Sequence, residues 1–148
     1  LLGLNAIRNW ATLLLLTSNG TEPQEVYAQS CARAKLCELI GHQIGEKTFA
    51  ENCFTVGLLS TLDIYLKIPI KAVAQHLNLS EEMNTALTKH TGRLGHVLAI
   101  ALAIEQLQWA KVTPAASHYK IAERTLSECY IQAYEWANRI QADIKDRP

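Results

Sequence analysis

Apolar residues recur at the spacing of an α-helix along almost the whole chain. Strand signals are missing, because no alternating runs of Val, Ile and Thr are joined by Asn-Gly or Asp-Gly turns. With 148 residues and 49% hydrophobic content, the chain is long enough for one ordinary domain with a buried core. The sequence therefore predicts an all-α fold: a single helical bundle domain over 1–148, with about six to eight helices.

Turn and capping residues divide the chain into predicted helices. The first apolar stripe starts at Leu4 and ends at the turn 18–20, and Thr21 then caps a helix that stops near 41–45. Ser80 is the predicted N-cap of a later helix, and Gly92 is placed just past that helix's end. The remaining predicted helices span about 49–66, 69–77, 94–107 and 116–144, with Thr113-Pro114 as a boundary between the last two.

The last predicted helix carries a narrow apolar stripe. Its members are spaced alternately four and three residues apart, as in a seam between packed helices. The stripe consists of Ala122, Leu126, Cys129, Ala133, Trp136 and Ile140. The spacing does not distinguish a seam inside the domain from the contact of a homodimer, and both interpretations stay open.

No group of residues has the spacing of a catalytic or metal site. The histidines, His42, His76, His90, His96 and His118, never fall three or four residues apart, as two metal ligands on one helix face must. No Gly-x-Ser-x-Gly sequence marks a nucleophile, and the glycines are scattered rather than gathered in a phosphate-binding loop. The sequence therefore predicts no catalytic residue, no metal, no cofactor and no enzyme activity.

Four cysteines, Cys31, Cys37, Cys53 and Cys129, lie among apolar or small residues, and none forms a Cys-x-x-Cys pair. We interpret them as reduced, buried thiols of a cytoplasmic protein, with a disulfide between two of them as the alternative. No signal peptide is recognisable, and the longest purely apolar run, 13–16, is too short to span a membrane. The chain begins without a methionine inside an apolar segment, which suggests a piece of a longer protein.

Charge argues against nucleic acid as a partner. Lys and Arg number 14, as do Asp and Glu, so the net charge is zero and phosphates are not generally attracted. The segment 71–83 is similar to a helix-turn-helix, but its second helix would begin with Glu81 and Glu82, which repel DNA. A DNA-binding regulator that uses 71–83 is therefore only the third hypothesis for the function.

Trp109 differs from the other two tryptophans. Trp10 and Trp136 fall on apolar stripes, whereas Trp109 stands among polar residues at the predicted end of a helix. Because tryptophan is frequent at the hot spots of protein interfaces, Trp109 is the candidate interaction residue, with core packing as the alternative.

Short motifs, in order along the chain, resemble those of HDOD domains. The first is Leu2-Gly3-Leu4, followed by the segment 7–10. The second, Arg33–Glu38, resembles the pattern Arg-Ala-x-x-Cys-Glu. The third, Phe54–Asp63, resembles the pattern Phe-x-x-Gly-Leu-Leu. Four further segments, Leu59–Asp63, Pro69–Val73, Leu79–Met83 and Tyr130–Ala137, are most similar to the HDOD half of YuxH-like EAL–HDOD proteins of bacterial signal transduction. The resemblance covers nearly the whole chain and indicates the C-terminal portion of an HDOD domain, which implies an HD-like helical bundle.

This resemblance implies a site that has lost its catalytic residues. HDOD domains are similar to HD-type metal phosphohydrolases, in which the Gly-Leu-Leu helix continues into a metal-binding His-Asp pair. Ser60 and Thr61 occupy those positions here; neither hydroxyl is a strong metal ligand, and Asp63 alone holds no catalytic ion. The resemblance thus implies a non-catalytic signal-transduction module that contacts other proteins, linked to cyclic di-GMP. A degenerate phosphohydrolase or nucleotide-binding domain is the alternative.

Overall fold

A computed structural model describes residues 24–77 and 79–145, which form an all-α bundle with no strand among them. The predicted fold class is therefore confirmed, with eight helices in the described residues. They are α2 (Gln24–Ile44), α3 (Lys47–Leu59), α4 (Leu62–Leu66), α5 (Ile70–His76), α6 (Glu81–Lys89), α7 (Gly92–Glu105), α8 (Trp109–His118) and α9 (Glu123–Lys145). The features predicted before residue 24, including the Thr21 cap and the stripe with Trp10, lie outside the described residues.

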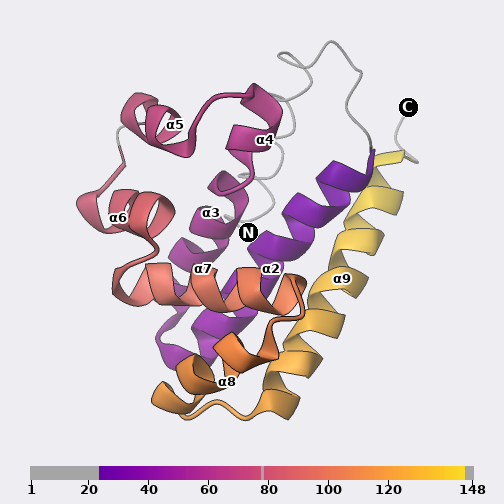
Figure 1. The fold of residues 1–148 in the computed structure, drawn as a ribbon. Coiled ribbons are helices and arrows are strands. Elements are labelled where there is room, and N and C mark those ends of the chain that lie inside the picture. The colour runs from indigo at the N-terminus through magenta and orange to yellow at the C-terminus, as the bar shows by residue number, and fades with distance from the viewer. Residues whose placement is uncertain (1–23, 78, 146–148) are drawn as a thin grey trace.

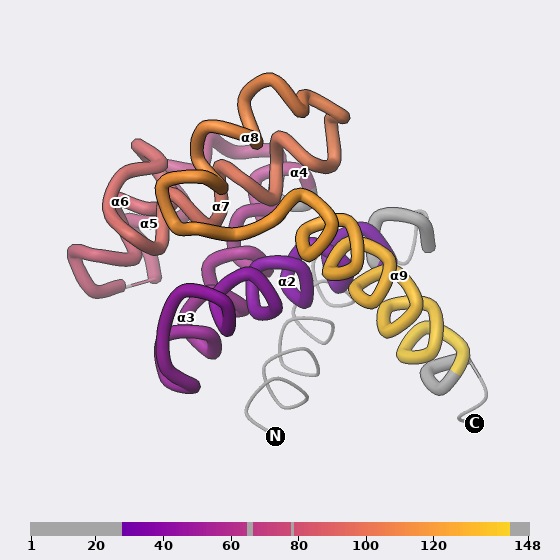
Figure 2. The backbone as a smooth tube through the Cα atoms, turned by 90° about the horizontal axis from the view of Figure 1, so that it is seen from below, coloured from indigo at the N-terminus to yellow at the C-terminus, as the bar shows by residue number. Residues whose placement is uncertain are grey.

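Helix α2 lies between α3 and α9 in both views, and α7 packs across α2 and α3 (Figures 1 and 2). Helix α8 packs on α7, and α6 contacts both α7 and α3. The short helices α4 and α5 join α3 to α6 (Figure 1). This arrangement brings α2 into contact with elements from the middle and the end of the chain. No helix in the described ranges is long and apolar enough to cross a membrane.

Helix α7, where the sequence predicted a helix over about 94–107, is buried over most of its surface. Eight of its residues are buried: Leu94, Gly95, Val97, Leu98, Ile100, Ala101, Ala103 and Ile104. The helix ends at Glu105, so Leu107 lies in the turn that follows rather than in the helix.

The middle of the narrow stripe on the last helix lies inside the domain. Leu126, Cys129 and Ala133 are buried in the main apolar core, and α9 packs along α2. Ala122 is exposed and precedes α9, whereas Trp136 and Ile140 are half-buried. The buried part of the stripe is therefore a seam between α9 and α2, and it is not available as a dimer contact.

Helices α2 and α3 approach each other closely because each presents a glycine to the other's cysteine. A Cβ atom added at Gly57 would lie 2.9 Å from the Sγ of Cys37 and 3.0 Å from an α-carbon of α2. A Cβ added at Gly41 would lie 2.9 Å from the Sγ of Cys53 and 3.0 Å from an α-carbon of α3. The same Cys-x-x-x-Gly spacing thus serves both helices. All four cysteines are buried free thiols in the structure, as the sequence predicted.

The predicted helix 49–66 is wrong as one element, because it breaks between α3 and α4. The hydroxyl groups of Ser60 and Thr61 donate hydrogen bonds to carbonyls three residues earlier, at Gly57 and Leu58. Such side-chain bonds compete with the backbone hydrogen bonds of the α-helix. The backbone N–H of Thr61 also bonds to the carbonyl three residues earlier, at Leu58, rather than four residues earlier, at 3.3 Å. Ser60 and Thr61 are therefore the point at which the chain changes direction.

Of the two boundaries predicted for α6, one differs from the structure and one agrees with it. Gly92 does not follow the end of α6; His90 caps that helix with a φ of 54°, and Gly92 is the first residue of α7. Ser80 caps α6 as predicted, because its Oγ accepts a hydrogen bond from the N–H of Met83 at 3.3 Å. Histidine thus takes the left-handed backbone position that was expected for glycine.

The boundary predicted at Thr113-Pro114 is wrong, since Pro114 lies inside α8. Proline supplies no N–H for the carbonyl of Ala110, but both residues are exposed, so water can reach that carbonyl. The predicted helix 116–144 is in turn two elements: α8 runs to His118, and Lys120, with a φ of 58°, reverses the chain before α9.

Candidate functional site

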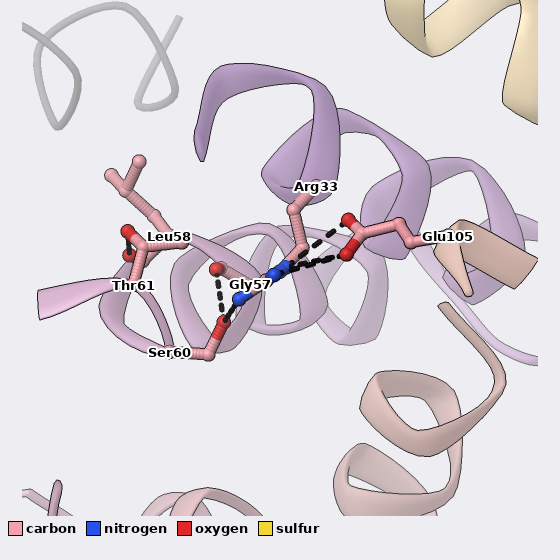
Figure 3. Close-up of polar contacts among 6 residues, drawn as sticks. All are labelled: Arg33, Gly57, Leu58, Ser60, Thr61 and Glu105. Carbon is pink, nitrogen blue, oxygen red and sulfur yellow. Dashed lines mark hydrogen bonds and ion pairs between the residues drawn. The ribbon is translucent and has the colours of Figure 1, made fainter. Parts of the chain in front are cut away.

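Ser60 and Thr61 directly follow the last residue of α3. The Oγ of Ser60 donates to the carbonyl of Gly57 at 2.6 Å, and the Oγ1 of Thr61 donates to the carbonyl of Leu58 at 2.7 Å (Figure 3). Thr61 is only 1% exposed. Both hydroxyl protons are therefore used within the turn itself, and Thr61 is closed to solvent.

Arg33 reaches this turn from α2. Its Nη1 donates to the Oγ of Ser60 at 3.2 Å, while Nε and Nη2 donate to the Glu105 carboxylate of α7 at 3.0 to 3.2 Å (Figure 3). The side chains of Arg33 and Glu105 are 9% and 8% exposed. A buried, bidentate ion pair thus joins α2 to α7, and the bond from Arg33 to Ser60 adds the end of α3. We call Arg33, Ser60 and Glu105 the junction.

Gly57 makes the junction possible. A Cβ atom at this position would lie 3.1 Å from the carbonyl oxygen of Arg33, closer than most real contacts of a Cβ. The missing side chain lets the backbone of α2 approach α3, and this approach brings the Arg33 guanidinium within hydrogen-bonding distance of Ser60. Two of the motifs that resemble HDOD domains, Arg33–Glu38 and Phe54–Asp63, therefore meet in space at this point.

Burial also governs ionisation around the junction. It raises the pKa of the Cys37 thiol well above its usual value, with smaller contributions from Cys53 and Glu105. Burial, followed by the contact with Tyr130, raises the pKa of Tyr134 in α9 to about 12. Both groups stay protonated at neutral pH, so neither supplies a nucleophile there.

Asp63 does not join this network. Its Oδ1 accepts a hydrogen bond from the N–H of Ile64 at 2.8 Å, which places the carboxylate in the first turn of α4. Among the described residues, no three His, Cys, Asp or Glu side chains lie close enough together to hold one metal ion. Asp63 therefore shares none of the hydrogen bonds that Ser60 and Thr61 make.

The five histidines lie apart from the junction's hydrogen bonds. The Nε2 of His42 is 3.7 Å from the Glu38 carboxylate, and the Nδ1 of His96 is 2.6 Å from the Tyr119 hydroxyl. His118 packs edge-on against the ring of Tyr119. These contacts fit surface histidines with partners of their own.

The two other sites considered from the sequence have clear positions. Trp109 is the first residue of α8, half-buried and packed against the main core, so its ring serves the fold at least in part. The segment 71–83 comprises most of α5 and the start of α6, and residue 78 between them is not described. Glu81 and Glu82 are exposed in the first turn of α6, as the sequence suggested.

Sequence reasoning missed Arg33 and Glu105 as partners. Arg33 stands in a motif that was noted, but Glu105 lies 72 residues away and has no local signal of its own. A buried charge is informative only once its partner is known, and the partner here comes from the packing of α7 on α2.

The chain is similar over almost its whole length to two bacterial proteins. The uncharacterized protein YuxH of Bacillus subtilis is 28% identical over 144 residues, which cover 95% of this chain and 34% of YuxH. The cyclic di-GMP phosphodiesterase CdgJ of Vibrio cholerae is 26% identical over 140 residues, which cover 94% of this chain and 32% of CdgJ. The chain thus spans about a third of the length of these relatives. No family model and no solved structure matches it.

Proposed function

We propose that the chain is a non-catalytic, HDOD-type regulatory module of cyclic di-GMP-linked signal transduction, which acts by contacting other proteins. The observation that carries the proposal is the hydrogen bonding of Ser60 and Thr61. At the positions where HD-type phosphohydrolases hold metal, both hydroxyls bond to their own helix and Arg33 donates to Ser60.

The residues present do not fit a divalent metal ion. An ion bound to Ser60 would meet the positive guanidinium of Arg33, which lies 3.2 Å from the same oxygen. Binding to Thr61 would require opening a residue that is 1% exposed and breaking its bond to Leu58. Neutral hydroxyls next to a fixed cation make a poor donor set for the hard cations that activate water in phosphoester hydrolysis.

The link to cyclic di-GMP rests on the relative CdgJ. Its name describes a phosphodiesterase, and this chain matches about a third of it, so the hydrolysis can belong to the other two thirds. A module without chemistry of its own fits a regulatory part of such a protein. The name also supports the second candidate, in which this segment itself binds or hydrolyses a nucleotide.

A DNA-binding function through 71–83 has less support. A recognition helix presents its first turn to phosphates and base edges, and the first turn of α6 carries the exposed carboxylates of Glu81 and Glu82. With equal numbers of basic and acidic residues, the chain also has no overall attraction for DNA.

The direct test combines a hydrolysis assay with a binding measurement on the purified chain. Cyclic di-GMP and its linear dinucleotide product are incubated with the chain in Mg²⁺ or Mn²⁺, and we expect no turnover. Proteins captured on the immobilised chain are then purified and titrated against it, and we expect saturable binding that EDTA does not change. Metal-dependent turnover that disappears in Thr61→Val would contradict the proposal and support the second candidate. Salt-sensitive DNA binding that increases in E81Q/E82Q would support the third.

A further inference from the structure

Charged side chains are unevenly distributed along the chain. The segment 83–122 includes the end of α6, all of α7 and all of α8; it has four Lys and Arg residues, and its only carboxylate is that of Glu105. The side chain of Glu105 is 8% exposed and paired with Arg33, so it adds little negative charge to the surface. The exposed lysines and arginines of this segment therefore have no exposed carboxylate within it to balance them. Because the whole chain has equal numbers of basic and acidic residues, the rest of it has an acidic excess.

Contacts between three helices bring most of these basic residues together. His90 ends α6, and its backbone lies so close to Gly95 of α7 that no Cβ would fit there. Arg93 and His96 are three residues apart and exposed, so they lie on the same side of α7. The Nδ1 of His96 is 2.6 Å from the hydroxyl of Tyr119, which directly follows α8. The end of α6, the start of α7 and the end of α8 thus meet at one surface.

We call this surface the basic surface, and all of its members are exposed. It consists of Lys89, His90, Arg93, His96, His118 and Lys120. His118 packs edge-on against the ring of Tyr119, and Lys120 follows that tyrosine in the chain. Lys111, the remaining cation of the segment, lies in the first turn of α8, away from the end that joins the basic surface.

The cations of the basic surface have no acidic partner in the structure. On α9, by contrast, Arg124 lies 3.2 Å from the carboxylate of Glu128. Within the ranges that the structure describes, Lys89, Arg93 and Lys120 form no such ion pair. Their charges are therefore available to a partner.

Two side chains of the basic surface are also held in place. The Cζ of Arg93 lies 4.3 Å from the centre of the Phe49 ring, and its Nη2 donates to the carbonyl of Ile44 at 3.4 Å. His96 is held by its contact with Tyr119. A partner does not have to immobilise these two side chains, which lowers the entropy cost of binding.

Two exposed carboxylates border the basic surface. Glu46 precedes the exposed Lys47, so the turn between α2 and α3 has no net charge. The Oε1 of Glu123, three residues after Lys120, accepts a hydrogen bond from the hydroxyl of Thr113. Even with Glu123 counted, the basic surface keeps a positive charge, because two lysines and an arginine belong to it.

The surroundings favour an acidic protein over a nucleic acid or a membrane. Duplex DNA is a long rod of phosphates, so it would extend from the basic surface to the exposed carboxylates of Glu81 and Glu82 at the other end of α6. Helix α7 starts within the basic surface, but it is buried over most of its own surface and cannot enter a groove of DNA. None of the large apolar side chains found exposed in the described residues belongs to the basic surface, so it has no residue to insert into a membrane. An acidic patch on a folded protein can match the basic surface without reaching those carboxylates.

We propose that the basic surface is a docking site for an acidic surface of another protein. The proposal rests on the proposed function, because it names the chemistry of one partner of a module that acts through protein contacts. Attraction between exposed charges is screened by salt, so the binding should weaken as the ionic strength rises.

Fluorescence anisotropy of a labelled oligoglutamate peptide, titrated with the purified chain at low and at physiological salt, tests the proposal. We expect saturable binding at low salt that weakens at physiological salt. The double variant K89E/K120E should bind the peptide about tenfold more weakly than the wild type, because two attractive charges become repulsive.

The double variant K67E/K71E is the matched control. It changes the net charge by the same amount and also replaces two exposed lysines, on α5 and in the turn before it. Lys67 has a left-handed backbone like that of Lys120, so the two variants also make the same demand on a turn. We expect K67E/K71E to weaken the binding by less than about twofold, because its charges are not on the basic surface.

Three results would overturn the proposal. The first is the absence of peptide binding to the wild type at low salt. The second is an equal loss in the two double variants, because net charge alone would then explain the binding. The third is tighter binding of duplex DNA, or of vesicles of phosphatidylserine and phosphatidylcholine, than of the peptide.

None of these results affects the non-catalytic role, which the hydrolysis assay tests separately. Conversely, metal-dependent hydrolysis by a chain that binds the peptide through the basic surface would contradict the proposed function and leave the docking site intact.

Discussion

Two regions of the molecule, joined by the end of α7, differ in which side chains they bury: one buries charged groups, and the other exposes an apolar one. At the junction, Glu105 is buried and its carboxylate accepts hydrogen bonds from Arg33, which also bonds to Ser60. Two residues later, Leu107 leaves a large apolar side chain in water. The charged groups of Arg33 and Glu105 are nearly closed to solvent, whereas the apolar side chain of Leu107 is exposed. This difference is what we expect of a module that transmits contacts rather than transforms a substrate.

The largest expected effect comes from removing one partner of the buried ion pair between Arg33 and Glu105. Glu105→Ala leaves the Arg33 guanidinium buried without a counter-charge and should lower the free energy of unfolding by about 3–5 kcal/mol in urea denaturation. Replacing both residues, as in R33M/E105L, should restore most of that loss, because no buried charge is left unpaired.

The exposed ion pair between Arg124 and Glu128 is the matched control. Its side chains are 91% and 56% exposed at a distance of 3.2 Å, so Glu128→Ala should change the stability by less than about 0.5 kcal/mol. Similar small losses for Glu105→Ala and Glu128→Ala would show that the junction is not the buried connection described above.

Gly57→Ala should lower the free energy of unfolding by about 1–3 kcal/mol, because the new methyl group overpacks the contact between α2 and α3. It would meet Cys37 Sγ at 2.9 Å and the carbonyl oxygen of Arg33 at 3.1 Å. Adding Cys37→Ala removes only the sulfur contact, so the double variant should regain part of the loss. Full recovery in thermal or urea denaturation would mean that the backbone contact is unimportant.

The buried thiols should make the domain unstable in alkali. Burial raises the pKa of Cys53 from 9.0 to about 12 and that of Cys31 to about 11. Above pH 9 the unfolded chain loses thiol protons that the folded chain keeps, so this stabilisation is complete below pH 9 and declines above it. The decline is about 1.4 kcal/mol per pH unit for each thiol.

Urea denaturation between pH 8 and pH 11 measures this decline. Cys53→Ala should flatten the slope of stability against pH by the contribution of one thiol, whatever it does to the stability at pH 8. An unchanged slope would show that Cys53 ionises as easily in the folded chain as in the unfolded one.

The smallest expected effect is a gain in stability from a substitution at the exposed Leu107, which has a left-handed backbone. Leu107→Gly should raise the free energy of unfolding by about 0.5–1 kcal/mol. Glycine removes the cost of the left-handed backbone in the folded chain, and its greater freedom in the unfolded chain offsets part of that gain. Lys120→Gly at the end of α8 should give a similar gain, and it is the matched control. A clear loss of stability in Leu107→Gly alone would indicate that the leucine side chain packs within the domain.

The sequence predicted the helices where apolar spacing and caps agree, as at Ser80 and along α7. It missed the breaks at Ser60-Thr61 and at Lys120, because neither has a glycine or proline; side-chain hydrogen bonds and packing of neighbouring helices end the helix there. Conversely, Pro114 looked like a boundary and is tolerated within α8, on its exposed side.

The candidate site could be predicted only in part. Its place in the chain followed from the resemblance of Phe54–Asp63 to the Gly-Leu-Leu helix. The Arg33 to Glu105 pair could not be foreseen, since its partners are far apart in sequence and meet only when α7 crosses α2. The role of Gly57 was equally hidden, because a glycine in a helix signals close packing only when the facing helix is known.

Binding of Mn²⁺ to the purified chain tests the central claim most directly. The electron paramagnetic resonance signal of free Mn²⁺ is measured while the chain is added at equal concentration. We predict that the signal stays at its full intensity, for the wild type and for Thr61→Val alike, because the hydroxyls at 60 and 61 are bonded internally beside a fixed cation. Loss of one equivalent of free Mn²⁺ to the wild type, and its recovery with Thr61→Val, would show that these positions still hold a metal.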